Sequence, residues 1–313
     1  MFKRIPAIRA LRTFRTLGIL WLFALGPSLP LPALAAEGEA APSSETVEPA
    51  EQEETFASGI GGIDESPFSI EGLSPEAAGE AIFREVDRRE SGYQDLKVDL
   101  VMILRTAKGS ESSRSLRIRQ LEVPEDGDRL LVVFDTPKSI RGTALLSYAH
   151  KVEPDDQWMY LPALKRVKRI ASQNRSGPFL SSEFAYEDMA LQEVEKFTYR
   201  FVALDERDGE PVFLVERFPT DEHSGYARQL VAVHADAFRI EHIEYFDERD
   251  RLLKTLAVSG YQLFEDRYWK AGRMLMSNVQ TGKSTELLWE GFEFATGLDA
   301  DRDFSTNSLR RAR

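Results

Sequence analysis

The chain has 313 residues and no cysteine, and its 52 acidic against 40 basic residues give a formal net charge of −12. The lack of cysteine excludes disulfides and a cysteine-linked lipid anchor. The acidic excess argues against nucleic acid as a partner, because binding to phosphates requires a basic surface.

Residues 1–36 have the three parts of a secretory signal peptide. Five basic residues, from Lys3 to Arg15, precede the apolar run Leu17–Leu25, which is too short to span a bilayer. Small residues follow at Ala33-Leu34-Ala35, so we expect cleavage near Ala35/Ala36 and a soluble mature protein in the periplasm. Cleavage would leave 35 basic residues against 52 acidic ones, a net charge of −17 (35 − 52).

Residues 37–72 are predicted to form an acidic, disordered tether. The stretch from Glu37 to Glu65 contains nine acidic residues and no basic residue, and it is rich in Ala, Pro, Ser and Gly. It serves either as a solubilising tail or as a docking segment. The folded domain is therefore expected to comprise residues 73–313, a length that one core can serve.

One helix is well marked at the start of this domain. Ser74 is the expected N-cap, and Pro75 occupies the first helical position. Apolar residues recur at helical spacing from Ala78 to Val86, and Gly92 marks the stop.

Nearly everything after this helix reads as β-strands, from 96–105 to 285–294, joined mostly by short turns. The later runs include Leu252–Phe264 and Tyr268–Gln280. About ten or eleven successive strands favour antiparallel pairing, and so many strands in one sheet must curl or close. The predicted class is α+β, mostly β: a half-open antiparallel β-barrel curled around a helical plug or lid, with an apolar cavity.

The usual signatures of catalysis and of metal binding are missing from the sequence. Gly282-Lys283-Ser284 resembles the end of a phosphate-binding loop, but Ser277 stands where that motif requires glycine. The four histidines lack the spacing of a zinc helix motif, and there is no G-x-S-x-G elbow. We therefore expect a non-enzymatic protein with no cofactor and no metal site.

The stretch from Trp158 to Met189 combines apolar and basic side chains, as binding of an anionic amphiphile requires. Two alternatives remain. The aromatic residues could be ordinary residues of the hydrophobic core, and the cations could lie on a solvated strand end or loop without a ligand. The candidate cavity residues are Leu100, Met102, Val132, Phe134, Trp158, Tyr160, Leu161, Phe179, Phe184, Tyr186 and Met189. The candidate contacts for an anionic headgroup or a partner are Lys165, Arg166, Lys168, Arg169 and Arg175.

Several of these segments resemble the LolA-like outer membrane lipoprotein-sorting protein family, in its uncharacterised branch. The resembling segments are Val86–Gly92, Pro137–Leu146, Trp158–Ile170, Ser176–Phe179, Phe184–Met189 and Trp269–Thr285. The resemblance implies a half-open β-barrel closed by helices, with an apolar cavity for acyl chains.

The same resemblance implies a periplasmic carrier for a lipid or an acylated protein in outer-membrane or envelope lipid trafficking. Its expected partners are acyl chains and an inner-membrane transporter of the RND/MMPL-like or ABC type, and the carrier is expected to be a monomer. The alternative is an envelope sensor or accessory subunit that binds a membrane protein and uses the cavity for regulation.

Overall fold

The computed structural model of the chain describes residues 68–311. The predicted signal peptide and most of the predicted tether lie outside these residues. Within them, no helix is both long enough and apolar enough to cross a membrane.

Helix α1 (Pro75–Glu90) forms where the sequence predicts it. The Ser74 side chain accepts a hydrogen bond from the Ala77 amide at 3.2 Å, so it caps one of the free amides of the first turn. The buried face carries the predicted stripe of Ala78, Ile82, Phe83 and Val86, and Gly79 is buried beside them. Local capping and apolar spacing are therefore sufficient to predict this helix.

Most of the chain forms one antiparallel sheet of thirteen strands, so the mostly-β prediction is confirmed. The spatial order is β6-β5-β4-β3-β2-β1-β15-β14-β11-β10-β9-β8-β7. The first half of the chain provides β1 (Asp95–Arg105), β2 (Glu111–Leu121), β3 (Arg129–Thr136), β4 (Ala144–Tyr148), β5 (Asp156–Leu161) and β6 (Arg166–Ile170). The second half provides β7 (Phe197–Arg207), β8 (Glu210–Pro219), β9 (Arg228–His234), β10 (Ile240–Phe246), β11 (Leu252–Ser259), β14 (Arg273–Asn278) and β15 (Ser284–Phe294).

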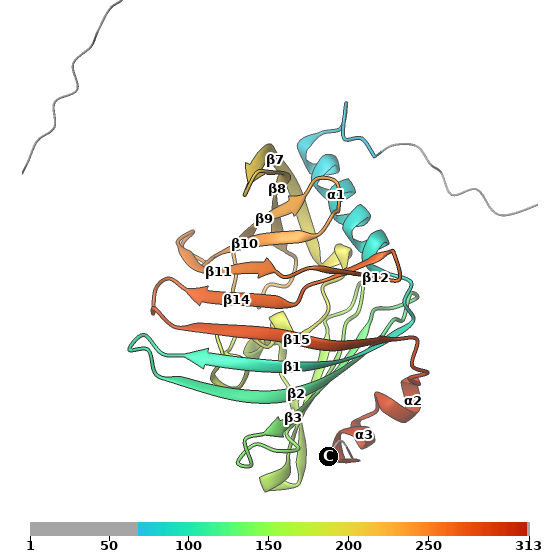
Figure 1. The fold of residues 1–313 in the computed structure, drawn as a ribbon, viewed down its shortest axis with the longest axis vertical. Helices are drawn as coiled ribbons and strands as arrows, with labels where there is room; N and C mark the ends of the chain where they lie inside the picture. The colour runs from blue at the N-terminus through green and yellow to red at the C-terminus, as the bar shows by residue number, and fades with distance from the viewer. Residues whose placement is uncertain (1–67, 312–313) are drawn as a thin grey trace, which may run out of the picture. The chain divides into compact units, whose positions relative to one another are not determined.

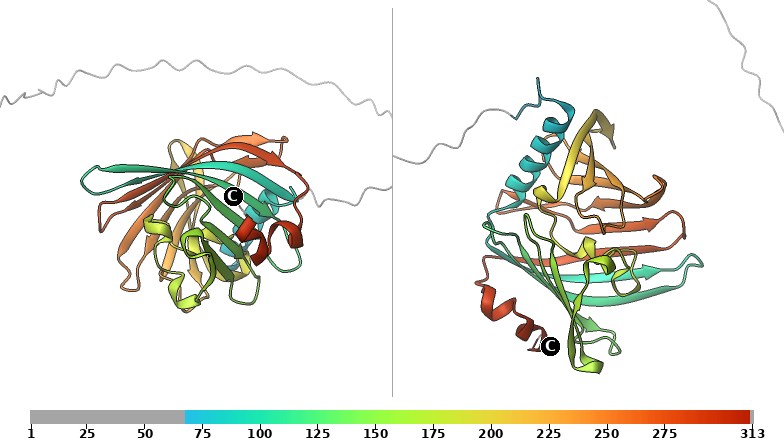
Figure 2. Two further views of the ribbon diagram at one scale, coloured as in Figure 1. Left: turned by 90° about the horizontal axis from the view of Figure 1, so that it is seen from below. Right: turned by 180° about the vertical axis from the view of Figure 1, so that it is seen from behind.

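The sheet is strongly curved but not closed (Figures 1 and 2). Strands β6 and β7 are its two edges, and they do not pair with each other. In the middle of the sheet, β1 pairs with both β2 and β15, so the two ends of the folded region meet there. The sheet is therefore not closed into a barrel, the half-open barrel stays a prediction, and the strand number exceeds the expected ten or eleven.

Two glycines account for part of the difference in strand number. Leu252–Phe264 and Tyr268–Gln280 were each expected to be one strand, but each is interrupted, at Gly260 and near Gly272. A Cβ atom on Gly272 would lie 2.8 Å from the carbonyl oxygen of Gly260, so the two backbones cross at close range. Beyond this crossing, β12 (Gln262–Phe264) and β13 (Tyr268–Lys270) form a separate two-stranded sheet.

The concave side of the sheet holds the main core. Helix α1 packs there, chiefly against β7. Buried apolar residues from nearly every strand join it in one cluster, which includes Leu100, Met102, Val132, Phe134, Leu145, Val215, Val231, Ile243, Leu256, Met276 and Leu287.

The convex side carries a second, smaller apolar cluster that the sequence did not predict. Leu131, Val133 and Tyr160 point to this side and pack with Phe304 and Leu309. Those two residues come from the C-terminal part of the chain, where α2 (Ala300–Asp303) and α3 (Thr306–Arg311) form. The helices explain why β3 and β4 are apolar on both faces.

The folded region begins slightly earlier than expected. The Phe68 ring lies 4.7 Å from the Phe238 ring and 6.2 Å from the Phe213 ring, measured between centroids. Residues 68–72 were expected to belong to the tether, but Phe68 and Ile70 pack against the main core.

Candidate functional site

The site is built around the segment from Ala171 to Lys196, which we call the crossing segment. It leaves β6 at one edge of the sheet and enters β7 at the other edge, so it spans the open side. The segment holds four single 3-10 turns. They are Ser172–Asn174, Phe179–Ser181, Glu187–Met189 and Val194–Lys196.

Apolar side chains of the crossing segment fill the concave side of the sheet. Phe179 has no exposed surface, and Phe184 and Met189 are 4% and 6% exposed. The Phe179 ring lies 5.7 Å from the ring of Phe134 on β3, and all these residues belong to the main core. The predicted cavity wall is thus covered by the chain itself.

Asp188 anchors the crossing segment to the β9–β11 side of the sheet. Its carboxylate lies 3.0 Å from Lys254 Nζ on β11, and both side chains are almost fully buried. The Tyr226 hydroxyl donates a hydrogen bond to Asp188 Oδ2 at 2.8 Å. Lys254 Nζ also lies 4.8 Å from the centre of the Tyr226 ring and donates to the Glu183 carbonyl at 2.8 Å. A charge pair buried this deeply is costly to break because each charge loses its partner away from water.

Other polar contacts hold the crossing segment to the β4–β5 side. Ser147 Oγ on β4 donates to the Met189 carbonyl at 3.1 Å, and Gln157 Nε2 on β5 donates to the Tyr186 carbonyl at 2.8 Å. These contacts and the Asp188 anchor come from opposite halves of the sheet. The segment therefore joins the two halves across the open side.

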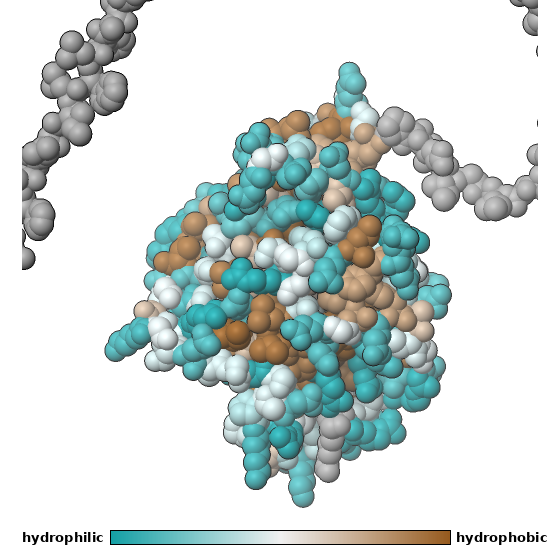
Figure 3. Space-filling view, in the orientation of Figure 1, coloured by the Kyte–Doolittle hydropathy of each residue, from teal (hydrophilic) through white to brown (hydrophobic). Residues whose placement is uncertain are grey.

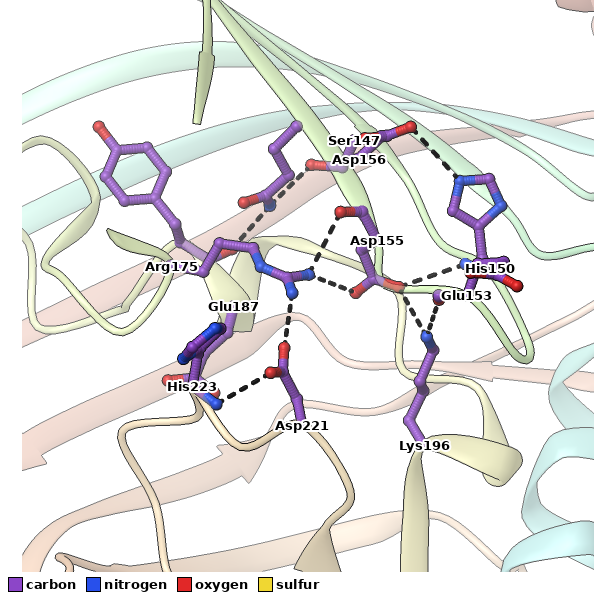
Figure 4. A network of polar contacts seen from close by, with 12 residues as sticks. Ser147, His150, Glu153, Asp155, Asp156, Arg175, Glu187, Lys196, Asp221 and His223 are labelled. Carbon is purple, nitrogen blue, oxygen red and sulfur yellow. Dashed lines mark hydrogen bonds and ion pairs between the residues drawn. The ribbon is translucent and has the colours of Figure 1, made fainter. Parts of the chain in front are cut away.

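Arg175 makes a second link between the halves (Figure 4). Its guanidinium lies 2.5 Å from Asp221 in the β8–β9 loop and 3.6 Å from Asp155 in the β4–β5 loop. Lys196 Nζ lies 3.4 Å from the same Asp155. Arg175 is buried, and its Nε has no hydrogen-bond partner among the described residues.

A pocket of about 490 Å³ adjoins this network. Its lining is mixed. The polar lining residues include Arg175, Lys196 and His223, and the apolar ones include Ala190, Leu191 and Phe197. The volume falls in the range of small-molecule sites, about 300–1,000 Å³. The pocket can accept a group that is part polar and part apolar.

Two carboxyl groups of the crossing segment have pKa values well above the usual range of a glutamate. Burial raises the pKa of Glu187 to about 7, and the neighbouring Asp188 carboxylate acts in the same direction. Burial also raises the pKa of Glu193 to about 7. Ser224 Oγ and the Gly225 amide donate to Glu187 at 2.7 and 2.9 Å, which favours its charged form but does not outweigh burial.

The structure brings most of the predicted cavity residues together. The residues that share the main core are Leu100, Met102, Val132, Phe134, Leu161, Phe179, Phe184, Tyr186 and Met189. Trp158 and Tyr160 instead lie on the convex side, in the cluster with Phe304 and Leu309. Side chains alternate along a strand, so these two residues of β5 face away from Met159 and Leu161.

The predicted headgroup contacts separate into two groups. Lys165, Arg166, Lys168 and Arg169 are exposed at and after the β5–β6 turn. Arg169 Nε donates to Asp156 Oδ1 at 3.0 Å. Arg175 is only 5% exposed and belongs to the internal network, so it is not part of the surface cluster.

Sequence reasoning missed the polar anchors. Asp188 lies inside the motif Phe184–Met189, but nothing in the sequence identified Lys254 and Tyr226 as its partners. The only signal for Lys254 is a charged residue at a buried-face position of β11, beside Leu256 and Val258, and Tyr226 lies in the β8–β9 loop without any such pattern. Among residues 68–311, no group of three or more His, Asp and Glu side chains could hold a metal ion.

Comparisons with known proteins agree with this architecture. A family model described as "Uncharacterized protein" matches residues 126–311. A domain described as outer membrane lipoprotein-sorting, from Vibrio parahaemolyticus, is 44% identical, with a TM-score of 0.74. The match covers 75% of this chain and 100% of that one. The chain belongs to the LolA-like outer membrane lipoprotein-sorting protein family.

Two other solved proteins have a similar fold. A DUF1329 family protein from Desulfovibrio piger is 26% identical, with a TM-score of 0.72, over 76% of this chain and 100% of that one. A LolA superfamily protein from Nitrosomonas europaea is 18% identical, with a TM-score of 0.60, over 73% and 98%. At that identity the similarity bears on the fold alone. No curated protein matches the chain.

Proposed function

We propose that the protein is a periplasmic carrier that binds the acyl chains of a lipid or an acylated protein. The acyl chains would lie against the concave side of the sheet, in the space that the crossing segment now fills. The observation that carries this proposal is the apolar lining that Phe179, Phe184 and Met189 share with Phe134 and its neighbours. The lipoprotein-sorting description of the 44% identical relative supports it.

Burial of acyl chains would supply the binding energy without any catalytic group. Removing a methylene from water contributes about 0.8 kcal/mol. To make room, Phe179, Phe184 and Met189 of the crossing segment would have to leave the main core, which loses apolar burial of a similar size. The free energies of the closed and lipid-loaded forms would then be nearly equal. This balance suits a carrier, which must release its cargo as well as bind it.

The mixed pocket beside Arg175 is proposed to receive the polar end of the ligand. It adjoins the crossing segment through Glu187, Ala190 and Leu191. A polar group there could replace the contacts of Arg175 with Asp155 or Asp221. Arg175 would then act as a headgroup contact from inside the domain.

An inner-membrane transporter of the RND/MMPL-like or ABC type is the proposed source or acceptor of the cargo. The predicted signal peptide and the family similarity support this role. A sensor or accessory subunit would be favoured instead if the protein took up no lipid and formed a stable complex with a membrane protein.

A disulfide lock tests whether the crossing segment must move for lipid to bind. A Cβ atom on Gly225 would lie 3.0 Å from the Cβ atom of Ser176, slightly closer than the ~3.5–4.5 Å of a disulfide. The variant Ser176→Cys/Gly225→Cys would tie the segment to the β8–β9 loop. Because the chain has no other cysteine, this bond would form without competing pairs.

Lipid uptake from vesicles, measured by native mass spectrometry, should be slow in the oxidised variant and recover after reduction. The reduced form of the same variant is the matched control, since it carries both substitutions without the bond. Equal uptake by oxidised and reduced protein would contradict the proposal.

A further inference from the structure

The turn between β5 and β6 is the apex of an exposed basic surface. The 3-10 turn Pro162–Leu164 ends at Lys165, which adopts the left-handed conformation with φ of 51°. Leu164 is 56% exposed, and Lys165, Arg166 and Lys168 are exposed around it. A bulky apolar side chain thus projects to solvent among cations.

The β3–β4 loop brings further cations to the same place. β4 pairs with β5 in the register Ala144 to Tyr160, so the start of β4 lies beside the end of β5. A Cβ atom on Gly142 would lie 3.4 Å from Pro162 Cγ, so the loop touches the turn. Lys138 and Arg141 of this loop are exposed. We call Lys138, Arg141, Lys165, Arg166 and Lys168, together with Leu164, the basic tip.

The cations of the basic tip are not neutralised by the rest of the described chain. Within residues 68–311, Lys138, Lys165, Arg166 and Lys168 form no ion pair with a carboxylate. The acids of the neighbouring strands are already engaged, Asp135 by Arg117 at 2.8 Å and Asp156 by Arg169. This concentration of free positive charge stands out in a chain of net charge −12.

We propose that the basic tip docks the protein onto an anionic lipid membrane. Phospholipid headgroups would meet the cations, and Leu164 would enter the interfacial region of the bilayer. An acidic protein partner would use the charges but would not require an exposed leucine at the apex. A membrane uses both, and local positive charge would offset the repulsion that an acidic protein otherwise meets at an anionic surface.

The position of the basic tip suits this role. Its turn lies at the lower end of the sheet in Figure 1, where Figure 3 shows hydrophilic side chains projecting outward. Helix α3 contacts β4, β5 and β6 and adds the exposed Arg310 and Arg311 on the convex side. Docking by this end leaves the concave side of the sheet clear of the membrane surface.

Vesicle co-sedimentation at low salt tests the proposal. The probes are vesicles of phosphatidylethanolamine with phosphatidylglycerol, compared with vesicles of phosphatidylcholine alone. The variant Lys138→Gln/Lys165→Gln/Arg166→Gln/Lys168→Gln should bind the anionic vesicles about two to three orders of magnitude more weakly than the natural protein. Leu164→Ala should weaken binding by a smaller, roughly several-fold factor that salt does not change.

The matched control removes four other exposed cations, in Lys108→Gln/Arg207→Gln/Arg249→Gln/Lys283→Gln. It changes the net charge equally but leaves the basic tip intact, so it should lose only a small part of the binding through added long-range repulsion. Equal losses in the two quadruple variants, or equal binding to both kinds of vesicle, would overturn the proposal. Surface docking does not require acyl uptake, so this test and the disulfide-lock test can fail separately.

Discussion

At the scale of single residues, Asp188 is the polar centre of the crossing segment. It accepts hydrogen bonds from Tyr226 and from the Ala185 amide at 2.7 Å, and it faces the buried ammonium of Lys254. The side chains of Asp188, Lys254 and Tyr226 are all buried, and each supplies the hydrogen bond or the opposite charge that another of them needs. We therefore expect the closed position of the segment to depend on this pair more than on any single apolar contact.

A double-mutant cycle tests that dependence. Asp188→Asn and Lys254→Met should each lower the free energy of unfolding by about 3 kcal/mol, because each leaves one buried charge without its partner. Asn at 188 can still accept a hydrogen bond from Tyr226. The double variant should therefore lose about 2 kcal/mol less free energy of unfolding than the two single losses added together. Urea denaturation followed by circular dichroism measures all four proteins.

The exposed pair Glu80–Arg84 on α1 is the control for this cycle, with a distance of 2.7 Å between its charged groups. Its coupling should stay below about 0.5 kcal/mol because solvent screens it. Additive effects at Asp188 and Lys254 would show that the buried pair does not hold the segment.

At the scale of elements, helix α1 is positioned by its close approach to β7. Gly79 faces the strand, and a Cβ atom there would lie 2.9 Å from the backbone nitrogen of Phe201 and 3.0 Å from that of Arg200. Backbone atoms cannot rotate away as a flexible side chain can. The glycine therefore sets the distance between the helix and the edge of the sheet.

Gly79→Ala should lower the free energy of unfolding by about 1–3 kcal/mol through this overpacking, although alanine is the better helix former. Thermal and urea unfolding measure the change. Ala77→Gly, at an exposed position two residues earlier, reports helix propensity alone and should cost at most about 1 kcal/mol. A stabilised Gly79→Ala protein would mean that the helix packs farther from β7 than described.

The elements differ in how far the sequence predicts them. Helix α1 has local signals in Ser74 and Pro75, and most strands show alternation or apolar runs, so both were predicted. Strand β6 was missed because Arg166–Ile170 places cations on both sides of its only central apolar residue. The C-terminal helices were missed because their apolar partners, Leu131 and Tyr160, lie far away in the sequence.

The candidate site was predicted only in part for the same reason. Composition identifies Phe179, Phe184 and Met189 as apolar residues near a turn, and these do reach the main core. Composition does not determine the face of a strand, so Trp158 and Tyr160 were assigned to the cavity although they lie on the convex side. The contacts of Arg175 with two distant loops depend on the sheet order, which local patterns do not contain.

At the scale of the whole folded region, an open sheet is completed by its own connecting segment. The two edges, β6 and β7, do not pair, and the crossing segment joins them while its side chains fill the concave side. The exposed cations on β6 also discourage pairing of that edge with another chain. The arrangement keeps the apolar interior covered, and under the proposed function an acyl chain would replace the segment.

Photo-cross-linking is the measurement that tests this account most directly. A phospholipid with a diazirine at the end of its acyl chain would be loaded into the protein, irradiated, and the labelled peptides identified by mass spectrometry. We expect labelling on the concave side, at peptides containing Leu100, Met102, Val132, Phe134 or Phe179. Labelling confined to the convex cluster around Tyr160 and Leu309, or no labelling after loading, would contradict the proposed acyl-binding site.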